Sequence, residues 1–259
     1  MLPTPSTSHV NYDHIYEPSE DSYLLLDTLA SPTETAFLRS QSPADSPSPL
    51  VLEVGTGSGV VLAFATAHAG LIFGRSDILT LGIDVNPFAC DATRQTALLA
   101  VKEAWGAQQA SGVFLDGVCS DLTAVMKPRS VDVLIFNPPY VPTANLPSPP
   151  EKYDADASGS SFDRDLYLSS LATDGGVEGM EITHRLLAQL PSVLSRRGIA
   201  YILLCAGNKP EQVMGSIRNW PTPHDGGGVW LAEKVSSSGK KAGWEKLGVI
   251  RIWRSEAQG

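Results

Sequence analysis

The sequence predicts an α/β domain built around a mostly parallel β-sheet, with helices on both faces. Short apolar runs of strand length alternate with helical segments along the 259 residues, an order typical of parallel sheets. A glycine-rich turn joins the first of these runs to a helix, as at the front of nucleotide-binding α/β units. Polar segments directly follow several runs, at the carboxyl ends where open α/β sheets bind ligands. We therefore expect a ligand-binding crevice at that edge of the sheet.

Composition and cysteine usage limit the class of protein. A chain of 259 residues with 42% hydrophobic residues is large enough for a substantial core. No apolar run approaches the ~20 residues of a membrane span, and the first residues lack the pattern of a secretory signal. The three cysteines are far apart and form no Cys-x-x-Cys pair, which argues against a zinc site or a disulfide framework. We therefore expect a reducing intracellular location, the cytoplasm, with the nucleus as a second location.

The charge balance bears on nucleic acids as partners. The formal net charge of −9 comes from 28 acidic and 19 basic side chains. A protein that binds duplex nucleic acid usually carries a basic surface that meets the phosphates. Because this chain is acidic and shows no basic stripe, direct nucleic-acid binding is not expected.

The amino-terminal region divides into a tail, a helical segment and a linker. Residues 1–14 are polar and rich in Pro, Ser and Thr, so we expect a flexible tail before a single domain over 15–259. Residues 15–39 predict a helical segment with acids in its first turn and a break near Pro32. The Pro- and Ser-rich residues 40–49 predict a linker.

Seven apolar runs predict the strands of the sheet. The first five alternate with helices and predict parallel strands, whereas the last two predict an antiparallel pair joined by a Ser/Gly/Lys turn. The predicted strands are 50–54, 78–84, 113–118, 131–136, 199–204, 229–232 and 249–253. The predicted helices between them are 60–65, 87–105, 180–194 and 209–219. Residues 141–175 are rich in Pro, Ser and Asp and predict a long active-site loop, since loops of this length are usually functional or disordered.

The glycine turn and the acids around it predict a cofactor site. Gly55, Gly57 and Gly59 do not have the spacing of the dinucleotide fingerprint. Glu53 precedes the turn, where it can order the glycine loop or bond a cationic amino-acid group. Asp84 ends the next predicted strand, where a ribose-binding acid belongs. The turn contains no Lys or Arg, so a ligand with ribose and adenine but no phosphates fits best, and S-adenosylmethionine is the obvious one.

The end of the third predicted strand adds two residues to this site. Asp121 can accept a hydrogen bond from an adenine amino group, and Leu122 can flank the ring. The alternative is a glycine turn with solvated loop acids, which the acids alone would favour. The ordered series of acids, together with the segment described next, favours a ligand site.

The segment Asn137-Pro138-Pro139-Tyr140 follows the largely apolar predicted strand 131–136. Proline has no N–H to donate, so the strand must end there in a rigid loop. The side-chain carbonyl of Asn137 and the backbone carbonyl of Pro138 can accept both hydrogens of a planar –NH2 group. Tyr140 offers a flat face on which a planar amide or base can stack. The alternative is a proline-rich turn without chemistry, and the surrounding site decides between the two.

Separated blocks of the sequence resemble one family of enzymes. The blocks are Tyr16–Ser22 with the leucine run that follows, Leu52–Val61, Asp84–Pro87 and Asn137–Val141. At these residues the chain resembles the class I S-adenosylmethionine-dependent methyltransferases with an Asn-Pro-Pro-Tyr motif, which methylate planar or conjugated nitrogens. Within that group it looks like the eukaryotic HemK-like glutamine methyltransferases of translation release factors. The resemblance covers most of residues 15–220.

The resemblance implies a Rossmann-like class I methyltransferase fold, S-adenosylmethionine as the cofactor, and residues 137–140 as the catalytic segment. It implies methylation of the glutamine in the Gly-Gly-Gln motif of the class I termination factor. A small zinc-binding activator protein is implied as the partner. The resemblance also implies that the helical segment 15–39 lies over the cofactor as a lid. The residues that the resemblance and the site together assign to the cofactor are Glu17, Ser22, Glu53, Gly55, Gly57, Gly59, Asp84, Val85, Asp121, Leu122 and Asn137.

The strand order of class I methyltransferases would place residues 113–118 at the edge of the sheet. This segment is apolar and lacks the lysine or proline that normally protects an exposed edge. We therefore expect the activator to add a strand there.

Three other functions remain as alternatives. Some members of the family act on lysine, so a histone or another protein could be the acceptor. A nucleic-acid amino methyltransferase would flip an adenine into the same pocket, against which the acidic charge counts. A non-catalytic adenosyl-binding scaffold is a different class of function, against which the intact Asn137–Tyr140 segment counts.

Overall fold

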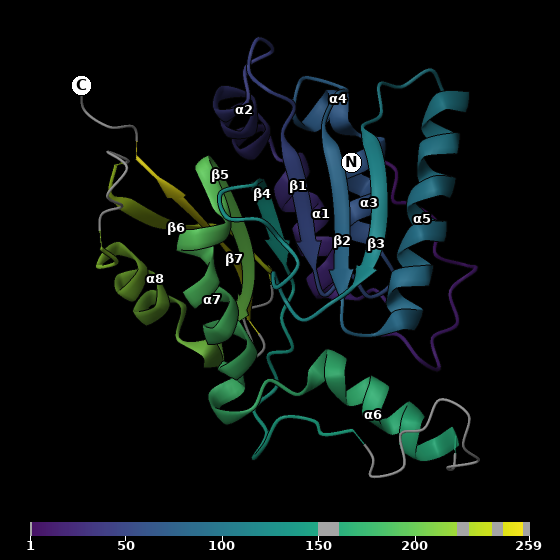
Figure 1. The fold of residues 1–259 in the computed structure, drawn as a ribbon, viewed down its shortest axis with the longest axis vertical. Coiled ribbons are helices and arrows are strands. Elements are labelled where there is room, and N and C mark those ends of the chain that lie inside the picture. The colour runs from purple at the N-terminus through teal and green to yellow at the C-terminus, as the bar shows by residue number, and fades with distance from the viewer. Residues whose placement is uncertain (1, 150–160, 222–227, 240–245, 256–259) are drawn as a thin grey trace.

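The computed structural model describes residues 2–149, 161–221, 228–239 and 246–255. Seven strands form one sheet in the order β3-β2-β1-β4-β5-β7-β6 (Figure 1). The strands are β1 (Leu50–Val54), β2 (Leu79–Asp84), β3 (Val113–Cys119), β4 (Val131–Phe136), β5 (Leu194–Cys205), β6 (Trp230–Ser237) and β7 (Leu247–Arg254). Strands β1 to β5 pair in parallel, and β7 is antiparallel to both β5 and β6. The prediction of a seven-stranded, mostly parallel sheet with an antiparallel C-terminal pair is confirmed.

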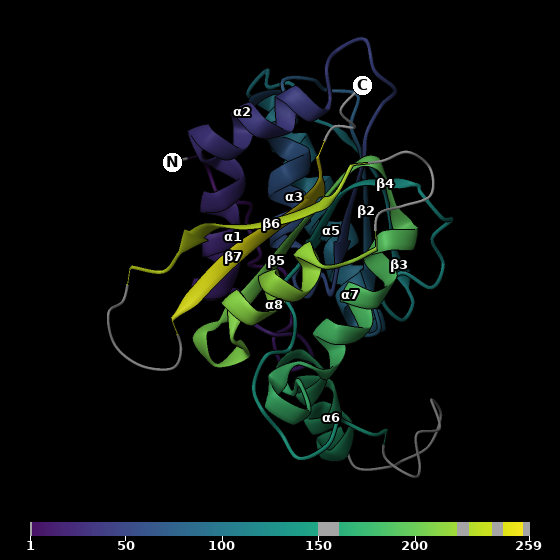
Figure 2. The same cartoon turned by 90° about the vertical axis from the view of Figure 1, so that its left-hand side faces the viewer.

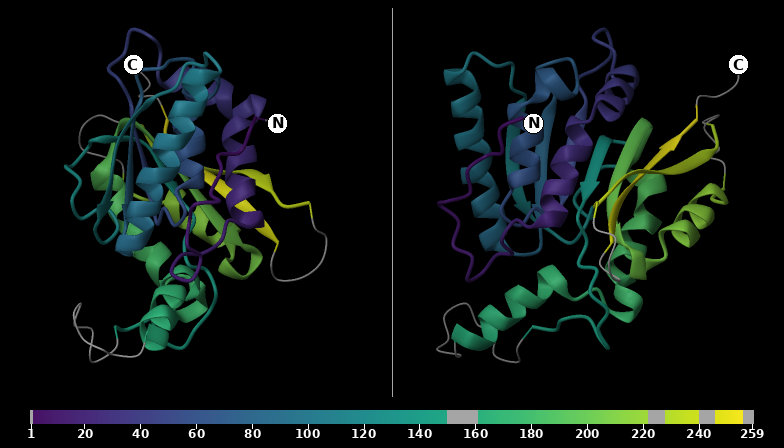
Figure 3. Two further views of the ribbon diagram at one scale, coloured as in Figure 1. Left: turned by 90° about the vertical axis from the view of Figure 1, so that its right-hand side faces the viewer. Right: turned by 180° about the vertical axis from the view of Figure 1, so that it is seen from behind.

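Two apolar layers cover the two faces of the sheet. The α-helices are α1 (Glu20–Ala30), α2 (Pro32–Gln41), α3 (Val60–Ala67), α4 (Ala69–Ile72), α5 (Pro87–Gly106), α6 (Ser161–Thr173), α7 (Glu181–Val193) and α8 (Pro210–Arg218). Helices α7 and α8 pack on one face, and α1 to α4 pack on the other, with α5 against α3 (Figures 1 and 3). All six residues of β4 are buried between the layers, which is why this strand is apolar except for Asp132. The Asp132 carboxylate pairs with Arg197 over 2.8 Å.

Helix α6 lies apart from both layers, across the carboxyl ends of the parallel strands (Figures 1 and 2). We expected residues 141–175 to form a loop, but Ser161–Thr173 is helical. One side of this helix is apolar, and Leu168, which is only 2% exposed, packs inward. The prolines and acids that precede the helix dominate the composition of residues 141–175. For this reason the sequence predicts a loop and not a helix with an apolar side. Residues 150–160 of the expected loop lie outside the described residues.

The amino-terminal tail also differs from the expectation of a flexible segment, because it packs along the domain. The Pro3 carbonyl oxygen lies 2.8 Å from His68 Nε2, and the His14 carbonyl accepts a hydrogen bond of 2.7 Å from Asn86 Nδ2. Both His68 and Asn86 are buried. The tail therefore satisfies buried polar groups of the domain, a role that its own polar composition does not reveal.

The predicted helical lid over 15–39 is two helices. Helix α1 ends at Ala30, and Ser31 caps α2 by accepting a hydrogen bond of 3.3 Å from the backbone N–H of Glu34. Pro32 occupies the first turn of α2, where its missing N–H costs nothing. The predicted break near Pro32 is confirmed.

A buried ion pair anchors α2 to the sheet. Arg251 Nη1 on β7 lies 2.9 Å from both carboxylate oxygens of Glu34 on α2, and the Tyr201 hydroxyl donates to the same carboxylate over 2.8 Å. Burial raises the pKa of Tyr201 well above its usual value, and the negative charge of Glu34 adds to the effect. Breaking one partner of a buried pair is strongly destabilising, so this network fixes α2 and, through it, the adjoining α1.

The remaining boundaries are close to expectation. Strand β5 begins at Leu194, five residues before the apolar run that starts at Ile199. The Ser/Gly/Lys turn expected between β6 and β7 falls mostly on residues 240–245, which lie outside the described residues. No helix of the described segments has the length and apolar character that spanning a membrane requires.

Candidate active site

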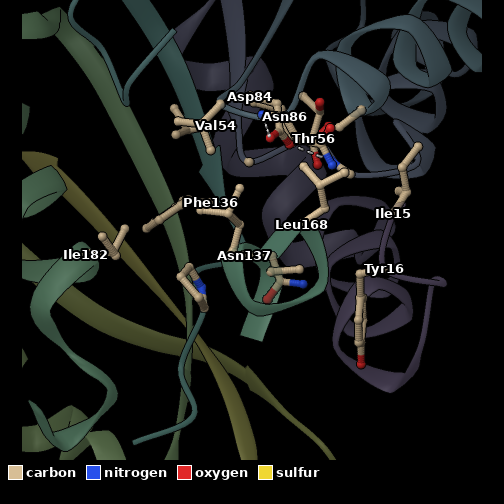
Figure 4. A pocket seen from close by; sticks show the side chains of 18 of the residues that line it. Ile15, Tyr16, Val54, Thr56, Asp84, Asn86, Phe136, Asn137, Leu168 and Ile182 are labelled. Carbon is tan, nitrogen blue, oxygen red and sulfur yellow. Dashed lines mark hydrogen bonds between the residues drawn. The ribbon is translucent and has the colours of Figure 1, made fainter. Parts of the chain in front are cut away.

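A cavity of about 290 Å³ opens at the carboxyl ends of β1, β2 and β4. This is the size of a small-molecule site. Its inner wall is the glycine turn after β1 with the ends of the strands, and its outer wall comes from α6, α7 and the segment before α1 (Figure 4). The strand-to-helix connections thus gather the polar residues that the sequence places after separate strands.

The glycine turn needs glycine for two different reasons. Gly55, Gly57 and Gly59 all have positive φ, at 66°, 52° and 77°, which is the left-handed region that side chains disfavour. A Cβ on Gly57 would meet no protein atom within 4 Å, so this glycine faces open space in the cavity wall. A Cβ on Gly59 would lie 2.6 Å from Thr93 Cα, and Gly59 does not line the cavity. Gly59 therefore permits α3 to pack against α5, whereas Gly57 leaves room for a ligand.

Glu53 is buried below this turn and holds it in place. Its Oε2 accepts a hydrogen bond of 2.8 Å from the backbone N–H of Leu62. Burial raises the pKa of Glu53 well above its usual value; the Leu62 N–H lowers it in part, and the charge of Asp84 raises it further. A cationic group of a ligand would favour the ionised form of this carboxyl.

Asp84 joins the glycine turn to the start of α5. One carboxylate oxygen accepts from Gly57 N over 3.0 Å and the other accepts from Asn86 N over 2.8 Å. Burial raises the pKa of Asp84, while backbone N–H donors, including those of Asn86 and Gly57, partly offset the effect. Each oxygen retains a further lone pair, and the side chain lines the cavity beside the exposed Val85. Asp84 can therefore accept from ligand hydroxyl groups while it holds both loops.

The end of β3 meets α7 at the mouth of the cavity. Asp121 and Leu122 both line the cavity, as predicted from the sequence. Asp121 is half exposed and forms an ion pair with Arg185 of α7, a partner that the sequence did not suggest. Leu122 is 5% exposed and has a φ of 48°, an unusual conformation for a residue with a side chain. The adenine-binding role predicted for Asp121 stays a prediction, with Arg185 added to the same wall.

Asn137 projects from the end of β4 into the cavity (Figure 4). Its Nδ2 donates a hydrogen bond of 3.1 Å to Oδ2 of Asp21 in α1. Its Oδ1 is buried and has no hydrogen-bond partner among the described residues. Buried polar atoms are almost always satisfied, so an unpaired acceptor in a cavity wall calls for a ligand donor. The arrangement is what the sequence analysis expected for an acceptor of –NH2 hydrogens.

The rest of the Asn-Pro-Pro-Tyr segment lies around this point rather than in the cavity. Pro139 lines the cavity, whereas Pro138 is buried and does not. Tyr140 is partly buried against the apolar layer that contains α1 and α3, and it does not line the cavity either. Gly179 allows the chain before α7 to approach this segment, since a Cβ there would lie 2.0 Å from the Tyr140 carbonyl oxygen. The stacking role predicted for Tyr140 has no support from its position.

The segment before α1 contributes one wall of the cavity. Tyr16 and Ser22 line it, as the resemblance implied for Ser22, but Glu17 is exposed and lies outside it. Neighbouring side chains of this extended segment point in different directions. Tyr16 therefore lines the cavity, whereas Glu17 faces solvent. Burial, and then the charge of Asp21, raises the pKa of Tyr16.

Sequence reasoning missed Asp21 and Arg185. The sequence shows Asp21 as one of several acids in a helical first turn, where acids occur for their interaction with the helix dipole alone. Arg185 lies on a predicted helix, and nothing in the sequence indicates that this helix faces the end of β3. Both contacts join segments that are far apart in the chain, so only the fold reveals them.

The outer wall is apolar and comes mostly from α6. Leu168, Leu171 and Ala172 of this helix line the cavity together with Leu146 and Pro147. The end of α6 is tied to the catalytic segment, because Val141 N donates to the Thr173 carbonyl over 3.0 Å. This wall presents an apolar surface to the cavity.

The cavity residues fit a phosphate-free adenosyl ligand that carries a positive charge. Asp84, Glu53 and Asp121 supply carboxylates, and the glycine turn offers no cationic side chain to a phosphate. Gly57 leaves open space beside Asp84, and the Asn137 acceptor lies unpaired. These hydrogen-bond acceptors of the protein therefore match the donors of such a ligand, which are ribose hydroxyls, an adenine amino group and an ammonium group.

Comparison with solved structures identifies the class of fold. The catalytic domain of hMettl16, solved with a MAT2A 3′UTR hairpin, superposes with a TM-score of 0.52 at 10% sequence identity, over 95% of this chain and 75% of that one. Such a likeness concerns the fold alone, and together with the strand order it shows the Rossmann-like class of α/β fold.

Sequence comparison identifies the family within that class. The "eRF1 methyltransferase catalytic subunit mtq2" of Schizosaccharomyces pombe is 31% identical over 98% of this chain and 96% of its own length. "Methyltransferase HEMK2" of Mus musculus is 31% identical over 98% of both chains. A "putative protein N5-glutamine methyltransferase" of Methanocaldococcus jannaschii is 29% identical over 94% of this chain and 93% of that one. No family model matches the sequence. The chain belongs to the HemK-like methyltransferase family of these relatives, enzymes that use a methyl donor of the S-adenosylmethionine type.

Proposed function

We propose that this enzyme transfers a methyl group from S-adenosylmethionine to the side-chain amide of the glutamine in the Gly-Gly-Gln motif of a class I translation release factor. The observation that supports this most directly is the buried, unpaired Oδ1 of Asn137 in the cavity wall. A relative named for eRF1 and another named for glutamine support the choice of acceptor. An amide –NH2 is planar and donates two hydrogen bonds, which suits a site built from acceptors.

The donor would be held by the residues at the strand ends. Asp84 would accept from the ribose hydroxyls, and Asp121 with Leu122 would border the adenine. Glu53 and the open face of Gly57 would receive the charged amino-acid end. When bound, this donor supplies a methyl group on a sulfonium, and the protein supplies binding and orientation.

The chain's own contribution is positioning. An amide nitrogen is a weak nucleophile because its lone pair is delocalised into the carbonyl. Asn137 Oδ1 accepts one amide hydrogen and so directs the nitrogen along one line. From the sequence we expected the Pro138 carbonyl as the second acceptor, but Pro138 does not line the cavity, so the mechanism rests on Asn137. Holding two reactants in line lowers the barrier by several kcal/mol, with ~7–11 kcal/mol as the upper range.

The same acceptor also stabilises the transition state. Positive charge develops on the nitrogen during transfer, and a carbonyl oxygen interacts more strongly with a cationic N–H than with a neutral one. The apolar wall of α6 keeps water away, which strengthens that interaction. The proton leaves to solvent after transfer.

We also propose a small zinc-binding activator protein as partner at the β3 edge. Strand β3 ends the sheet, and Val113 and Leu115 on it are 50% and 48% exposed. Leu98 and Trp105 on the neighbouring α5 are 60% and 68% exposed, so the apolar surface continues beyond the strand. A partner that adds a strand there would pair the free backbone groups and cover these side chains. Phe114 instead packs against the alanine cluster between α3 and α5, so it serves the core.

We propose a cytoplasmic location, where translation terminates, with the nucleus as a second location. A fluorescently tagged chain followed in cells together with its release factor tests this proposal. Confinement of the chain to a secretory compartment would contradict it.

A transfer assay with labelled donor tests the acceptor. The enzyme, mixed with its activator, is incubated with release factor, with histones or with DNA. We expect label on the release factor and loss of that label in a factor whose Gly-Gly-Gln glutamine is changed to alanine. Label on histones or DNA at a higher rate than on release factor would overturn the proposal in favour of lysine or adenine.

A further inference from the structure

We propose that Asp21 is a positioning residue that sets the orientation of the Asn137 side-chain amide and polarises it toward the acceptor. The proposal rests on the proposed function only in assigning a planar –NH2 group to the space beside Asn137. The unit consists of one carboxylate on α1 and one amide at the end of β4, which are 116 residues apart in the chain.

An asparagine side chain can point either of two similar ends at a ligand. Its oxygen accepts hydrogen bonds, whereas its –NH2 group donates them. If the –NH2 end of Asn137 faced the cavity, it would meet the –NH2 group of the acceptor with donors on both sides. A carboxylate accepts only, so Asp21 Oδ2 selects the –NH2 end of Asn137 and leaves Oδ1 facing the acceptor.

Asp21 is itself held firmly. It is 4% exposed, and its other oxygen, Oδ1, accepts from the Ser22 backbone N–H over 2.6 Å and lies 3.3 Å from Ser22 Oγ. The helix that carries it is fixed in the core by Leu25 and Leu29, both fully buried. A residue that orients another must have one conformation of its own, and these contacts provide it.

The charge of Asp21 adds a second effect. A hydrogen bond to an ionised acceptor is roughly twice as strong as a neutral one, and it draws electron density through the amide toward its oxygen. In a water-excluded site such polarisation is felt strongly. Asn137 Oδ1 therefore presents more negative charge to the nitrogen on which positive charge develops, without any contact between Asp21 and the acceptor.

Variants on α1 separate these effects. Asp21→Asn retains the shape and one acceptor oxygen but loses the charge, and Asp21→Ala loses both. Asp27→Asn is the matched control, since Asp27 is an exposed acid on the same helix. The measurements are kcat and KM for the release factor, donor affinity by calorimetry, and NMR of the Asn137 Nδ2 protons in ¹⁵N-labelled protein without donor, assigned by their loss in Asn137→Ala.

We expect Asp21→Ala to lower kcat about 10- to 100-fold, the range seen when a group that orients a metal ligand is removed. Asp21→Asn should lower kcat by less, and Asp27→Asn should match the wild type. Donor affinity and KM should stay within a few-fold in both Asp21 variants. Exchange of the Asn137 Nδ2 protons with solvent should become faster in Asp21→Ala.

Unchanged kcat with unchanged proton exchange in both Asp21 variants would overturn the proposal. So would a parallel loss of kcat, donor affinity and melting temperature, because that pattern belongs to a structural role. Asp21→Asn keeps the test valid if Asp21→Ala does not fold. If the wild-type chain methylates no release factor, the proposed function fails, and the NMR comparison still decides the role of Asp21.

Discussion

Replacing Asp84 by alanine should weaken donor binding much more than it weakens the fold. In the structure its carboxylate accepts one backbone N–H from the glycine turn and one from the start of α5. Losing two such bonds costs about 0.5–1.5 kcal/mol each in folding stability. Burial raises the pKa of the Asp84 carboxyl, which means that the ionised group is itself held at a cost in the folded state. Removing it relieves that cost and offsets part of the loss.

Donor binding has no such compensation. Ribose hydroxyls that lose a charged acceptor forfeit about 1.5–3 kcal/mol. Since about 1.4 kcal/mol is a factor of ten, the dissociation constant of S-adenosylmethionine should rise roughly 10- to 100-fold. Calorimetric titration gives this constant, and urea denaturation of the same preparations gives the free energy of unfolding.

Asp77→Ala is the matched control for Asp84→Ala. Asp77 lies two residues before β2, at the opposite end of the strand from Asp84. Its carboxylate is half exposed and pairs with Arg75, whose side chain is largely buried. Its replacement should leave the dissociation constant unchanged. An unchanged dissociation constant in Asp84→Ala as well would show that the ribose lies elsewhere and would refute the assignment of the cavity wall.

Three further predictions concern other parts of the molecule. Asn137→Ala should abolish transfer while calorimetry shows donor binding within a few-fold of wild type, and near-normal turnover would contradict the mechanism. Burial holds the pKa of Glu53 far above its usual value, so the folded state keeps a proton that the unfolded chain loses. Its contribution to the free energy of unfolding is fully present below the unfolded pKa of about 4.3 and is lost as pH rises through the folded pKa. Urea denaturation across pH should show this loss reduced in Glu53→Gln, and identical profiles would refute it. Val113→Lys should weaken co-purification with the activator without lowering donor affinity in the isolated chain; unchanged co-purification would exclude the β3 edge.

The sheet and the inner wall of the cavity could be predicted because their signals are local. Residues 131–136 are apolar except for Asp132, and the strand they predict is buried along its whole length. The residues that follow it cannot continue a ladder, so the position of Asn137 at the strand end follows directly. The positions of Asp84 and the glycine turn could be predicted in the same way, because each lies at the end of a strand in the sequence.

The rest of the site depends on contacts between distant segments. From the sequence, Asp21 is an ordinary acid at the start of a helix. Its contact with Asn137 exists only because α1 lies beside the end of β4 in the fold. Helix α6 follows a segment rich in proline and serine. Its apolar side lines the cavity, a role that can be recognised only once the fold shows what lies opposite the helix. Tyr140 was expected in the cavity because of its ring, but it packs against the apolar layer that contains α1 and α3. Packing decided each of these cases, and local preference could not anticipate it.

The most direct test of the whole account is to locate the methyl group. Release factor treated with enzyme, activator and S-adenosylmethionine is digested, and the peptide that contains the Gly-Gly-Gln motif is fragmented in a mass spectrometer. We expect one added methyl group on the glutamine side chain, absent when Asn137→Ala replaces the wild-type enzyme. A methyl group on another residue of that peptide, or an unmodified glutamine when the donor has been consumed, would contradict the account.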